Sequence, residues 1–409
     1  MHTTYSVDVA IIGGGIAGLW TLNHLVRQGY NAVLLENQGL GGGQTLASQG
    51  MIHGGMKYTL GGALTGASEA IADMPDHWRV CLRGEGDVDL RGTKPLSEHF
   101  HMWSTASLSS RLGGFLASKA VRGRVDPLNR EQLPELFRHH SFRGKVYRLV
   151  DMVMDTPSLV RTLAANMAGR LFAVDWHDAN LVVDDSGACH LSVDSGNAFS
   201  LRAAAWVFSA GEGNEALLTK VGSSTPRMQR RPLKQVMVRH HLPYRFYGHC
   251  LGAETTPRLT ISSHPLSDGS QVWYLGGSLA EKGAGQSDAE VLASAQAELA
   301  DLMPWLNFSD AQWAVLAVDR AEPRQRNLAR PDQAFADWAR GADGTALNAI
   351  AAWPTKLTLA PNLARQVSER LLERELRPSG APPPALPLAA PPIAATPWAT
   401  AFGVADATA

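Results

Sequence analysis

Residues 8–36, DVAIIGGGIAGLWTLNHLVRQGYNAVLLE, decide the fold. The β-branched and apolar residues over 7–12 predict a buried parallel strand. Apolar residues at helical spacing over 16–27 predict a helix that ends at Gly29. A second apolar run, over 32–35, predicts another parallel strand. The stretch is therefore a strand–helix–strand unit close to residue 1 of the sequence.

Three glycines, Gly13, Gly15 and Gly18, follow the first strand in the spacing G-x-G-x-x-G. A strand before them, a helix after them and the acidic Glu36 at the end of the second strand are the context in which this motif binds a dinucleotide. Gly13 would make the tight turn, Gly15 would let the backbone approach a pyrophosphate, and Gly18 would let helix and sheet pack closely. The helix N-terminus at Ile16 offers N–H groups to that pyrophosphate. Glu36 can accept hydrogen bonds from the ribose hydroxyls of an adenosine.

A second glycine cluster, NQGLGGGQTLASQGMIHGGMKYTLGG, occupies residues 37–62. Here the sequence resembles the FAD-dependent oxidoreductases of the D-amino-acid-oxidase superfamily. Residues 52–58, I-H-G-G-M-K-Y, are similar to the I-H-G-G-x-R-Y of FAD-linked glycerol-3-phosphate dehydrogenases, with lysine for arginine. Gln44-Thr45 and residues 49–55 resemble the Q-T loop and S-G-x-I-H-x-G of L-2-hydroxyglutarate dehydrogenases. The resemblance implies a loop that wraps the flavin pyrophosphate and then passes under the isoalloxazine ring.

Three later stretches resemble the same family. Residues 153–167 look like its helix before a β-meander, and residues 204–215 look like the segment that returns to the FAD domain. Residues 353–367, WPTKLTLAPNLARQV, are similar to the segment whose backbone meets the flavin pyrimidine ring. The helix that follows would place its positive N-terminal end near the N1–O2 edge of the reduced flavin.

The resemblance implies an α/β protein with a discontinuous Rossmann-like FAD-binding domain and a substrate domain built on a mixed or antiparallel sheet. The expected FAD-binding domain comprises residues 1–75, 145–215 and 325–376, the expected substrate domain comprises residues 76–144 and 216–324, and residues 377–409 form a Pro/Ala-rich tail. We expect no packed element in this tail, because eight prolines lie between Pro378 and Pro397.

The resemblance also implies a set of site residues. The expected FAD-binding residues are Gly13, Gly15, Ile16, Ala17, Gly18, Glu36, Asn37, Gln44, Thr45, Ser48, Gln49, Gly50, Ala210, Gly211, Lys356, Leu357 and Thr358. The expected catalytic or substrate-binding residues are His53, Lys57, Tyr58, Arg320 and Lys356.

The expected reaction is hydride transfer from a small hydroxy acid or polyol phosphate to flavin N5. The protein must then remove the hydroxyl proton and neutralise the charge of the substrate. His53 is open to three interpretations: a loop histidine that supports flavin or backbone, a catalytic base or substrate ligand, or a covalent attachment point for the flavin. Lys57 and Lys356 are candidates for pairing with a carboxylate or phosphate. Tyr58 would hydrogen-bond the substrate or simply pack.

One departure from the family concerns its G-x-R-P motif, because Glu322 precedes Pro323 in this chain. The arginine for an anionic substrate group would then be Arg320 or Arg324. The same departure supports an alternative function, an amino acid or secondary amine oxidase that uses oxygen, in which Glu322 would pair with an ammonium. A second alternative is a flavin-bound protein with a structural or docking role for its tail.

Composition and charge bear on the partners, the cellular location and the metal content that we expect of the protein. The 37 basic and 38 acidic residues nearly cancel, so charge gives no reason to expect a nucleic acid partner. No apolar run approaches the about 20 residues that span a bilayer. Three widely spaced cysteines favour a reducing compartment, and we expect a cytoplasmic protein with peripheral membrane contact left open. The two Arg-His-His stretches at 138–140 and 239–241 lack zinc-ligand spacing, so no metal is expected. The electron acceptor (oxygen, a quinone or an electron carrier) is left open.

Overall fold

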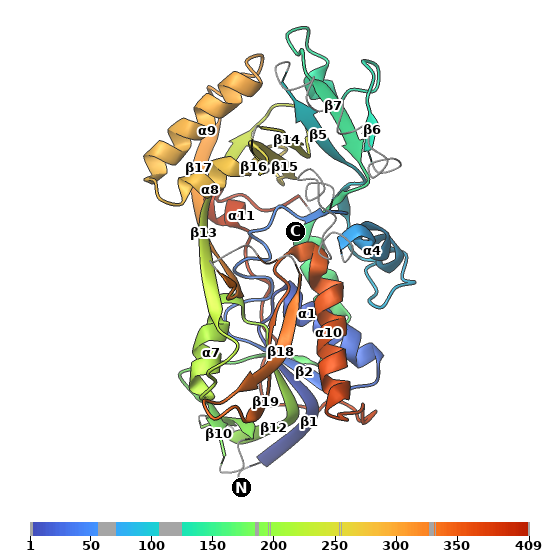
Figure 1. Cartoon of the computed structure of the whole chain (residues 1–409), viewed down its shortest axis with the longest axis vertical. Helices are drawn as coiled ribbons and strands as arrows, with labels where there is room; N and C mark the ends of the chain where they lie inside the picture. Colours follow the sequence, from blue (N-terminus) through green and yellow to red (C-terminus); the bar gives the residue numbers. More distant parts are fainter. Residues whose placement is uncertain are drawn as a thin grey trace.

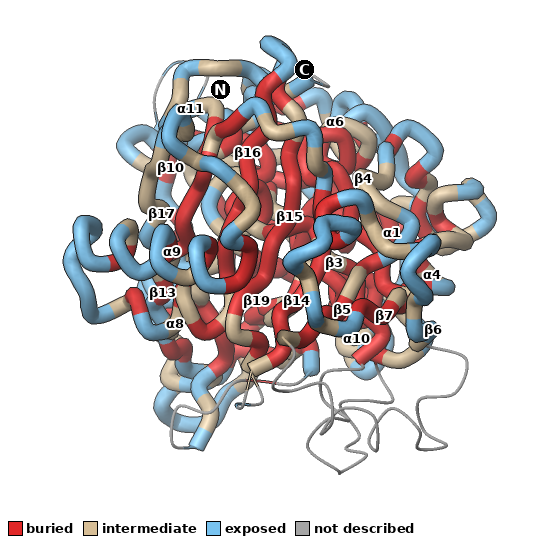
Figure 2. The backbone as a smooth tube through the Cα atoms, turned by 90° about the horizontal axis from the view of Figure 1, so that it is seen from above, coloured by how far each residue is buried: buried red, intermediate tan, exposed pale blue. Residues whose placement is uncertain are grey.

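Two large β-sheets lie toward opposite ends of the protein, with helices packed against them (Figure 1). The computed structural model describes residues 3–55, 71–105, 125–184, 188–194, 196, 198–252, 254, 256–326, 331 and 333–407. Within these ranges, buried segments run through the middle of the molecule and exposed segments form its outer loops (Figure 2).

The first sheet has a parallel centre, with β12, β1, β2 and β9 side by side and β19 parallel to the other edge of β12. An antiparallel meander of β10, β11 and β12 extends it, and β18 pairs antiparallel with β19. The strands are β1 (Thr3–Ile12), β2 (Ala32–Glu36), β9 (Leu171–Ala173), β10 (Ala179–Val183), β11 (Cys189–Val193), β12 (Phe199–Phe208), β18 (Phe335–Arg340) and β19 (Ala346–Trp353).

Both faces of this sheet are buried, which explains the continuous apolar runs in its strands. Ile11 packs in a core with α1, α6 and α10, whereas its neighbour Ala10 packs in a second core with α7. Successive side chains of a strand point to opposite faces, so each residue of such a run meets a core. The helices are α1 (Ile16–Arg27), α6 (Thr156–Ala165), α7 (Asn214–Lys220) and α10 (Ala360–Glu373), and 3₁₀ turns η4 (Gly211–Gly213) and η6 (Leu357–Leu359) precede α7 and α10.

The second sheet is mixed, because β14 and β5 run parallel while its other neighbours run antiparallel. Helices α8 and α9 contact it, and η3 joins its core. Its strands, in spatial order, are β17 (Gln312–Pro323), β13 (Met228–His240), β16 (Gln271–Gly276), β15 (Leu259–Pro265), β14 (Gly248–Cys250), β5 (Phe100–Ser104), β7 (Lys145–Leu149) and β6 (Val125–Pro127). The remaining helices are α4 (Met74–Leu82), η3 (Glu135–Phe137), α8 (Ser278–Gly283), α9 (Asp288–Leu302) and α11 (Pro397–Phe402).

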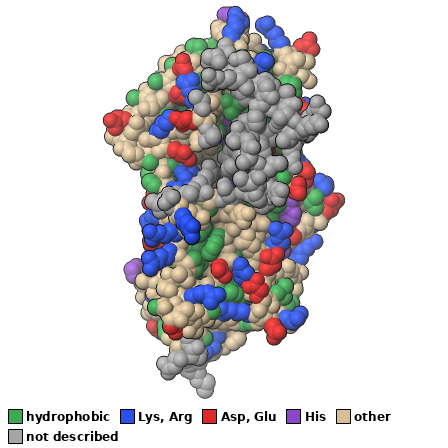
Figure 3. All heavy atoms as spheres, viewed as in Figure 1, with side chains coloured by type: hydrophobic (Ala, Val, Ile, Leu, Met, Phe, Trp, Pro, Cys, Tyr) green, Lys and Arg blue, Asp and Glu red, His purple; other side chains and the backbone are tan. Residues whose placement is uncertain are grey.

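A small sheet of β3 (Met51–Ile52), β8 (Met152–Met154) and β4 (Pro95–Ser97) completes the described strands. The predicted fold class is confirmed, since a largely parallel sheet with helices on both faces accompanies a mixed sheet. On the face shown in Figure 3, Lys and Arg side chains are interspersed with Asp and Glu side chains. None of the described helices is long and apolar enough to cross a membrane.

The prediction that the tail forms no packed element is wrong. Backbone hydrogen bonds tie it to β9 and to the loop after β2, from Ala173 N to Ala389 O (2.7 Å) and from Leu40 N to Pro392 O (2.8 Å). Its end forms α11, whose Trp398 is buried and stacks on His264 of β15 with ring centroids 4.2 Å apart. The tail therefore passes from the first sheet to the second. The tail packs because a few of its apolar side chains, such as Leu386 and Trp398, are buried, which its proline content did not indicate.

We predict that Trp398→Ala lowers the free energy of unfolding by about 3–5 kcal/mol, the usual cost of deleting a fully buried aromatic ring. The matched control is Ile393→Ala, because Ile393 lies in the same segment but is 38% exposed. Its cost should stay within about 0.5 kcal/mol, as for other surface changes. Urea unfolding followed by circular dichroism measures both. Equal, small losses would show that the tail does not pack as described.

Candidate active site

The carboxyl ends of the parallel strands in the first sheet border a cavity of about 1270 Å³. Ile12, Glu36 and Trp353, the last residues of β1, β2 and β19, line it. Residues of β13 and β17 from the second sheet line it as well. Open α/β sheets bind ligands at this edge. The volume exceeds the about 300–1,000 Å³ of common small-molecule pockets, which leaves room for a cofactor and a substrate together.

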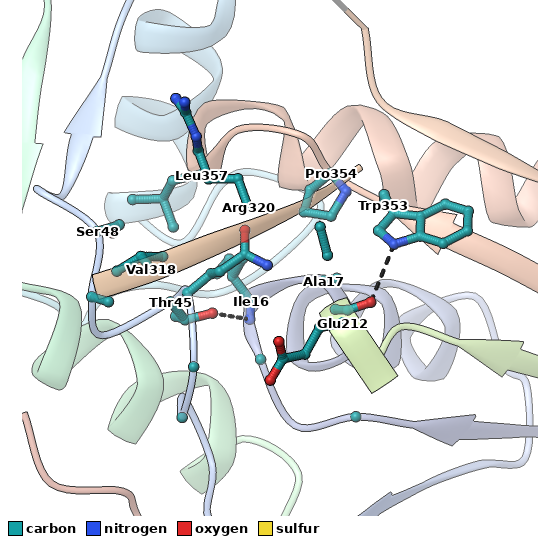
Figure 4. A pocket seen from close by; sticks show the side chains of 18 of the residues that line it. Ile16, Ala17, Thr45, Ser48, Glu212, Val318, Arg320, Trp353, Pro354 and Leu357 are labelled. Carbon is teal, nitrogen blue, oxygen red and sulfur yellow. Dashed lines mark hydrogen bonds between the residues drawn. The ribbon is translucent and has the colours of Figure 1, made fainter. Parts of the chain in front are cut away.

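The turn between β1 and α1 forms one part of the cavity wall. Gly13 has φ 109°, and a Cβ there would lie 2.6 Å from Ser209 O. Gly15 has φ −75°, and the described atom nearest to a Cβ there would be Thr45 Oγ1 at 3.1 Å. Ile16 N donates a hydrogen bond to the same Thr45 oxygen at 2.9 Å (Figure 4). The backbone at the start of α1 is therefore open to the cavity.

The carboxylate of Glu36 is held at the edge of the cavity by backbone amides. Gly14 N donates to its Oε2 at 2.5 Å, and the N–H groups of residues 37–39 donate to its Oε1. These bonds fix the carboxylate beside the glycine turn, as the sequence motif requires. Its contact with ribose hydroxyls stays a prediction.

Most of the predicted site residues gather around this one cavity. Those that line it are Gly13, Gly15, Ile16, Ala17, Glu36, Asn37, Gln44, Thr45, Ser48, Gln49, Ala210, Gly211, Arg320, Lys356 and Leu357. Gly18, Gly50, Thr358 and His53 are not among the described residues that line it, and Lys57 and Tyr58 lie outside the described residues.

Gly18 and Gly50 serve close backbone packing instead. A Cβ at Gly18 would lie 2.0 Å from Gly13 O, so only glycine lets α1 pack this closely against the turn that follows β1. Gly50 has φ 70°, and a Cβ there would lie 2.2 Å from Met154 O. Both glycines therefore support the cavity through backbone packing and do not line it themselves.

His53 lies behind the cavity wall, after Met51, which lines the cavity. Its side chain is buried, and its backbone N donates to Thr358 Oγ1 at 3.2 Å. The Thr358 hydroxyl in turn donates to Met51 O at 3.2 Å. This arrangement ties the strip under the cavity to the segment before α10. The catalytic and covalent roles considered for His53 stay predictions.

The second sheet contributes a buried polar group to the cavity. The Tyr274 hydroxyl lies 2.5 Å from Gln235 Oε1, and Gln49 Nε2 donates to Tyr274 O at 2.7 Å. Gln49 and Gln235 line the cavity. Burial raises the pKa of Tyr274 well above its usual range, so it stays a neutral hydrogen-bond donor. The group joins the loop after β2 to the second sheet.

His249 is a second polar side chain on this wall, next to Thr260. Its Nδ1 lies 2.8 Å from Thr260 Oγ1, and both residues line the cavity. The ring of Phe100 packs against the imidazole with centroids 4.6 Å apart. His249 is therefore oriented by one hydrogen bond and one ring contact.

Three cationic residues line the cavity within the described part of the chain, namely Lys220, Arg320 and Lys356. Lys220 Nζ donates to Asn180 Oδ1 at 3.2 Å. Arg320 extends from β17 past Leu357 in Figure 4, and its Nη1 lies 3.4 Å from Glu281 Oε1. Lys356 is only 9% exposed, and its Nζ donates to Pro331 O at 3.3 Å. Glu281 lines the cavity as well, so its carboxylate offsets part of the positive charge.

The role suggested for Glu322 does not hold. Its buried carboxylate accepts two hydrogen bonds from Arg231, at 2.7 and 2.8 Å, and it is not among the described cavity-lining residues. A carboxylate neutralised in this way is not available to a substrate ammonium. Arg324, the other predicted arginine, is exposed and likewise absent from the described lining. His240, in the second Arg-His-His stretch, is buried at the end of β13.

Several lining residues were missed by the sequence analysis, namely Gln235, His249, Thr260, Glu281 and Trp353. For His249 the sequence offered no signal, because a single histidine in a three-residue strand has no informative spacing. Its position follows from pairing of β14 with β5 and β15.

Comparison with known proteins decides the family. Residues 8–323 match the family model described as FAD dependent oxidoreductase (DAO). The chain belongs to this family. It is therefore an enzyme that uses FAD. The probable FAD-dependent oxidoreductase PA4991 of Pseudomonas aeruginosa is 48% identical over 405 residues, which cover 98% of this chain and 100% of that relative.

Solved structures agree with this assignment. The crystal structure of PA4991 matches with a TM-score of 0.83 at 43% identity, over 98% of this chain and 100% of that one. Glycine oxidase from Geobacillus kaustophilus shares the fold at 16% identity and a TM-score of 0.63, over 90% of this chain and 95% of that one. So does the reduced L-α-glycerophosphate oxidase from Mycoplasma pneumoniae with FAD bound, at 13% identity and a TM-score of 0.62, over 90% and 95%.

The residues present fit FAD. Gly15, Ile16 and Thr45 line the cavity at the first turn of α1, where a pyrophosphate would bind, and a Cβ at Gly15 would lie 3.1 Å from Thr45 Oγ1. Glu36 stands at the end of β2, where the ribose of a bound dinucleotide lies in this fold. Gln49 and Lys356, which come from the two segments predicted to meet the isoalloxazine, both line the cavity.

We predict that Gly15→Ala weakens FAD binding at least about tenfold, equivalent to about 1.4 kcal/mol, while the chain still folds. Alanine can adopt the backbone angles of Gly15, φ −75° and ψ −176°, and its methyl group would lie on the cavity wall, 3.1 Å from Thr45 Oγ1. It would therefore crowd the wall at which the pyrophosphate is expected. Flavin content after purification and FAD titration of the apoprotein measure the loss. Gly18→Ala is the contrasting variant, because its Cβ meets backbone and should prevent folding. Full FAD content in Gly15→Ala would contradict this site.

Proposed function

We propose that the enzyme dehydrogenates a small anionic alcohol, either a 2-hydroxy acid or a polyol phosphate. The observation that carries this proposal is the pair of cationic side chains, Arg320 and Lys356, which face the same cavity as the buried His249. When bound, FAD accepts a hydride from the substrate carbon. The chain itself must then bind the anion, hold the hydroxyl and take its proton.

Arg320 is the proposed anion-binding residue. A guanidinium forms two parallel hydrogen bonds with a carboxylate or phosphate, and such bonds to charged groups are roughly twice as strong as neutral ones. Arg320 Nη1 lies 3.4 Å from Glu281 Oε1 and its Nε donates to Arg231 O at 3.4 Å. These contacts are long and Glu281 is partly exposed, so an incoming anion can compete with Glu281. Lys356 would add a second positive charge from the segment before α10.

His249 is the proposed base. Its Nδ1 lies 2.8 Å from Thr260 Oγ1, so the Thr260 hydroxyl holds the imidazole in place on the cavity wall, and an imidazole is a base suited to neutral pH. An alcohol must lose a proton as its hydride leaves, so a base on the wall suits a hydroxyl substrate. An amine can react as its neutral free base without one. This difference, together with the engagement of Glu322 by Arg231, favours the hydroxyl substrate over the amine.

We also propose that the chain divides into a FAD-binding part and a substrate-binding part. The predicted division, with residues 1–75, 145–215 and 325–376 in the first part and residues 76–144 and 216–324 in the second, is supported by membership of the two large sheets. We move one boundary past Leu149, because β7 pairs with β5 in the second sheet.

An anaerobic screen of flavin reduction tests the substrate class. We expect lactate, 2-hydroxyglutarate or glycerol 3-phosphate to bleach the visible flavin absorbance, and glycine, sarcosine and proline to leave it unchanged. Readmission of oxygen or addition of a quinone then identifies the acceptor. Bleaching by the amines alone would overturn the proposal in favour of amine oxidation.

Two variants should separate binding from proton removal once a substrate is found. Arg320→Met should raise the substrate concentration for half-maximal flavin reduction about 10–100-fold, as expected for loss of a charge-assisted hydrogen bond. His249→Asn should slow flavin reduction at saturating substrate about 10²–10⁴-fold. Stopped-flow absorbance measures both. The matched control is Arg324→Met, which removes an exposed arginine near the end of the same strand and should change neither value.

A further inference from the structure

A second group of reactive side chains lies outside the cavity, on α4 and the loop that follows it. One ligand atom each from His77, Cys81 and Asp87 lies within 4.8 Å of the other two. His77 and Cys81 are four residues apart on α4, so their side chains leave the same face of the helix. In the sequence, the i, i+4 spacing of His77 and Cys81 is the signal for this cluster, which the two Arg-His-His stretches lack.

The loop after α4 is shaped to bring Asp87 over Cys81. Gly84 has φ 76°, which turns the chain back, and a Cβ at Gly86 would lie only 2.4 Å from Cys81 Sγ. As a result, Asp87 Oδ1 lies 2.7 Å from His77 Nε2 and 3.3 Å from Cys81 Sγ. The three side chains converge on one point because the backbone of the loop wraps the thiol.

The other oxygen of Asp87 is held by a chain of hydrogen bonds from the neighbouring helices. Ser368 donates to Gln28 Oε1 at 2.7 Å, which turns Gln28 Nε2 toward His24 Nε2 at 3.0 Å. His24 Nε2 then accepts, so His24 Nδ1 carries the proton and donates to Asp87 Oδ2 at 3.1 Å. Oδ2 is thereby occupied, and Oδ1 is directed at His77 and Cys81.

We propose that His77 Nε2, Cys81 Sγ and Asp87 Oδ1 bind a Zn²⁺ ion, with a water molecule as the fourth ligand. Nitrogen, sulfur and carboxylate oxygen are the donors that zinc takes in proteins. His24 acts as the supporting hydrogen-bond donor that metal-bound carboxylates have. On binding, the Cys81 thiol releases its proton to solvent as the Zn–S bond forms, and the His77 proton moves to Nδ1.

The site is accessible and lies in a place where an ion would stabilise the fold. The His77 and Asp87 side chains are 34% and 25% exposed, which gives the ion a route of entry. Trp78, next to His77, packs on Trp20 of α1 with ring centroids 4.6 Å apart and donates to Thr358 O at 3.1 Å. An ion here would fix α4 against the segment that precedes α10. None of the three ligand residues is among the described residues that line the cavity, so the proposal does not depend on the proposed reaction.

Zinc binding by the FAD-loaded full chain tests the proposal. The protein is dialysed against a chelator and titrated with Zn²⁺ in competition with a chromophoric zinc chelator, and bound zinc is counted by mass spectrometry. We expect one Zn²⁺ per chain. The zinc X-ray absorption spectrum should show one sulfur ligand at about 2.3 Å. His77→Gln and Cys81→Ser should each weaken binding at least tenfold with unchanged flavin content.

The control variant His139→Gln with His140→Gln removes an exposed pair of adjacent histidines, and zinc affinity should stay as in the wild type. His77→Gln carries the test if Cys81→Ser fails to fold, because His77 is partly exposed. No tight equivalent of zinc in the wild type, a spectrum without sulfur, or binding that only the control variant reduces would each overturn the proposal. The cluster would then be a partly exposed carboxylate held by hydrogen bonds alone.

Discussion

The structure depends on how closely three pieces of backbone meet at the start of α1. A Cβ at Gly18 would lie 2.0 Å from Gly13 O, and one at Gly13 would lie 2.6 Å from Ser209 O at the end of β12. Ser209 Oγ also donates to Ile12 O at 3.1 Å. Because no side chain separates them, β1, α1 and β12 form one corner. This close contact places the N-terminus of α1 at the wall of the cofactor cavity. It also fixes β12, with which β19 pairs.

The parts of the molecule that could be predicted are those whose structure is determined by residues close together in the sequence. Helix α1 spans Ile16–Arg27 as predicted, because glycines, apolar spacing and the terminal Gly29 all lie within one short stretch. Residues of the loop over 37–49 line the cavity as predicted, because the loop directly follows β2 and its motif is likewise contained in one short stretch. Arg320 was predicted from its place near the family's arginine motif, but His249 could not be predicted in this way. His249 reaches the cavity only because β14 pairs with β5 and β15.

Glu322 shows how a residue type acquires its role from the partner across the sheet. In the sequence it stands where the family has an arginine motif, and an acid there suggested a cationic substrate. In the fold, Arg231 on the neighbouring β13 binds both carboxylate oxygens. Removing a charged pair from water is costly unless its hydrogen bonds are satisfied, and here they are. The acid therefore maintains the strand pair, and Arg320, two residues earlier, faces the cavity.

The tail shows why proline content alone does not predict disorder. Proline cannot donate a hydrogen bond, but its carbonyl still accepts one, as Pro392 O does from Leu40 N. Its fixed φ also lowers the entropy of the unfolded chain, so ordering a proline-rich segment costs less. What decides the outcome is burial, supplied here by Leu386 against the first sheet and Trp398 against the second. Because the tail also packs on Gly39, it braces the loop that reaches the cofactor cavity.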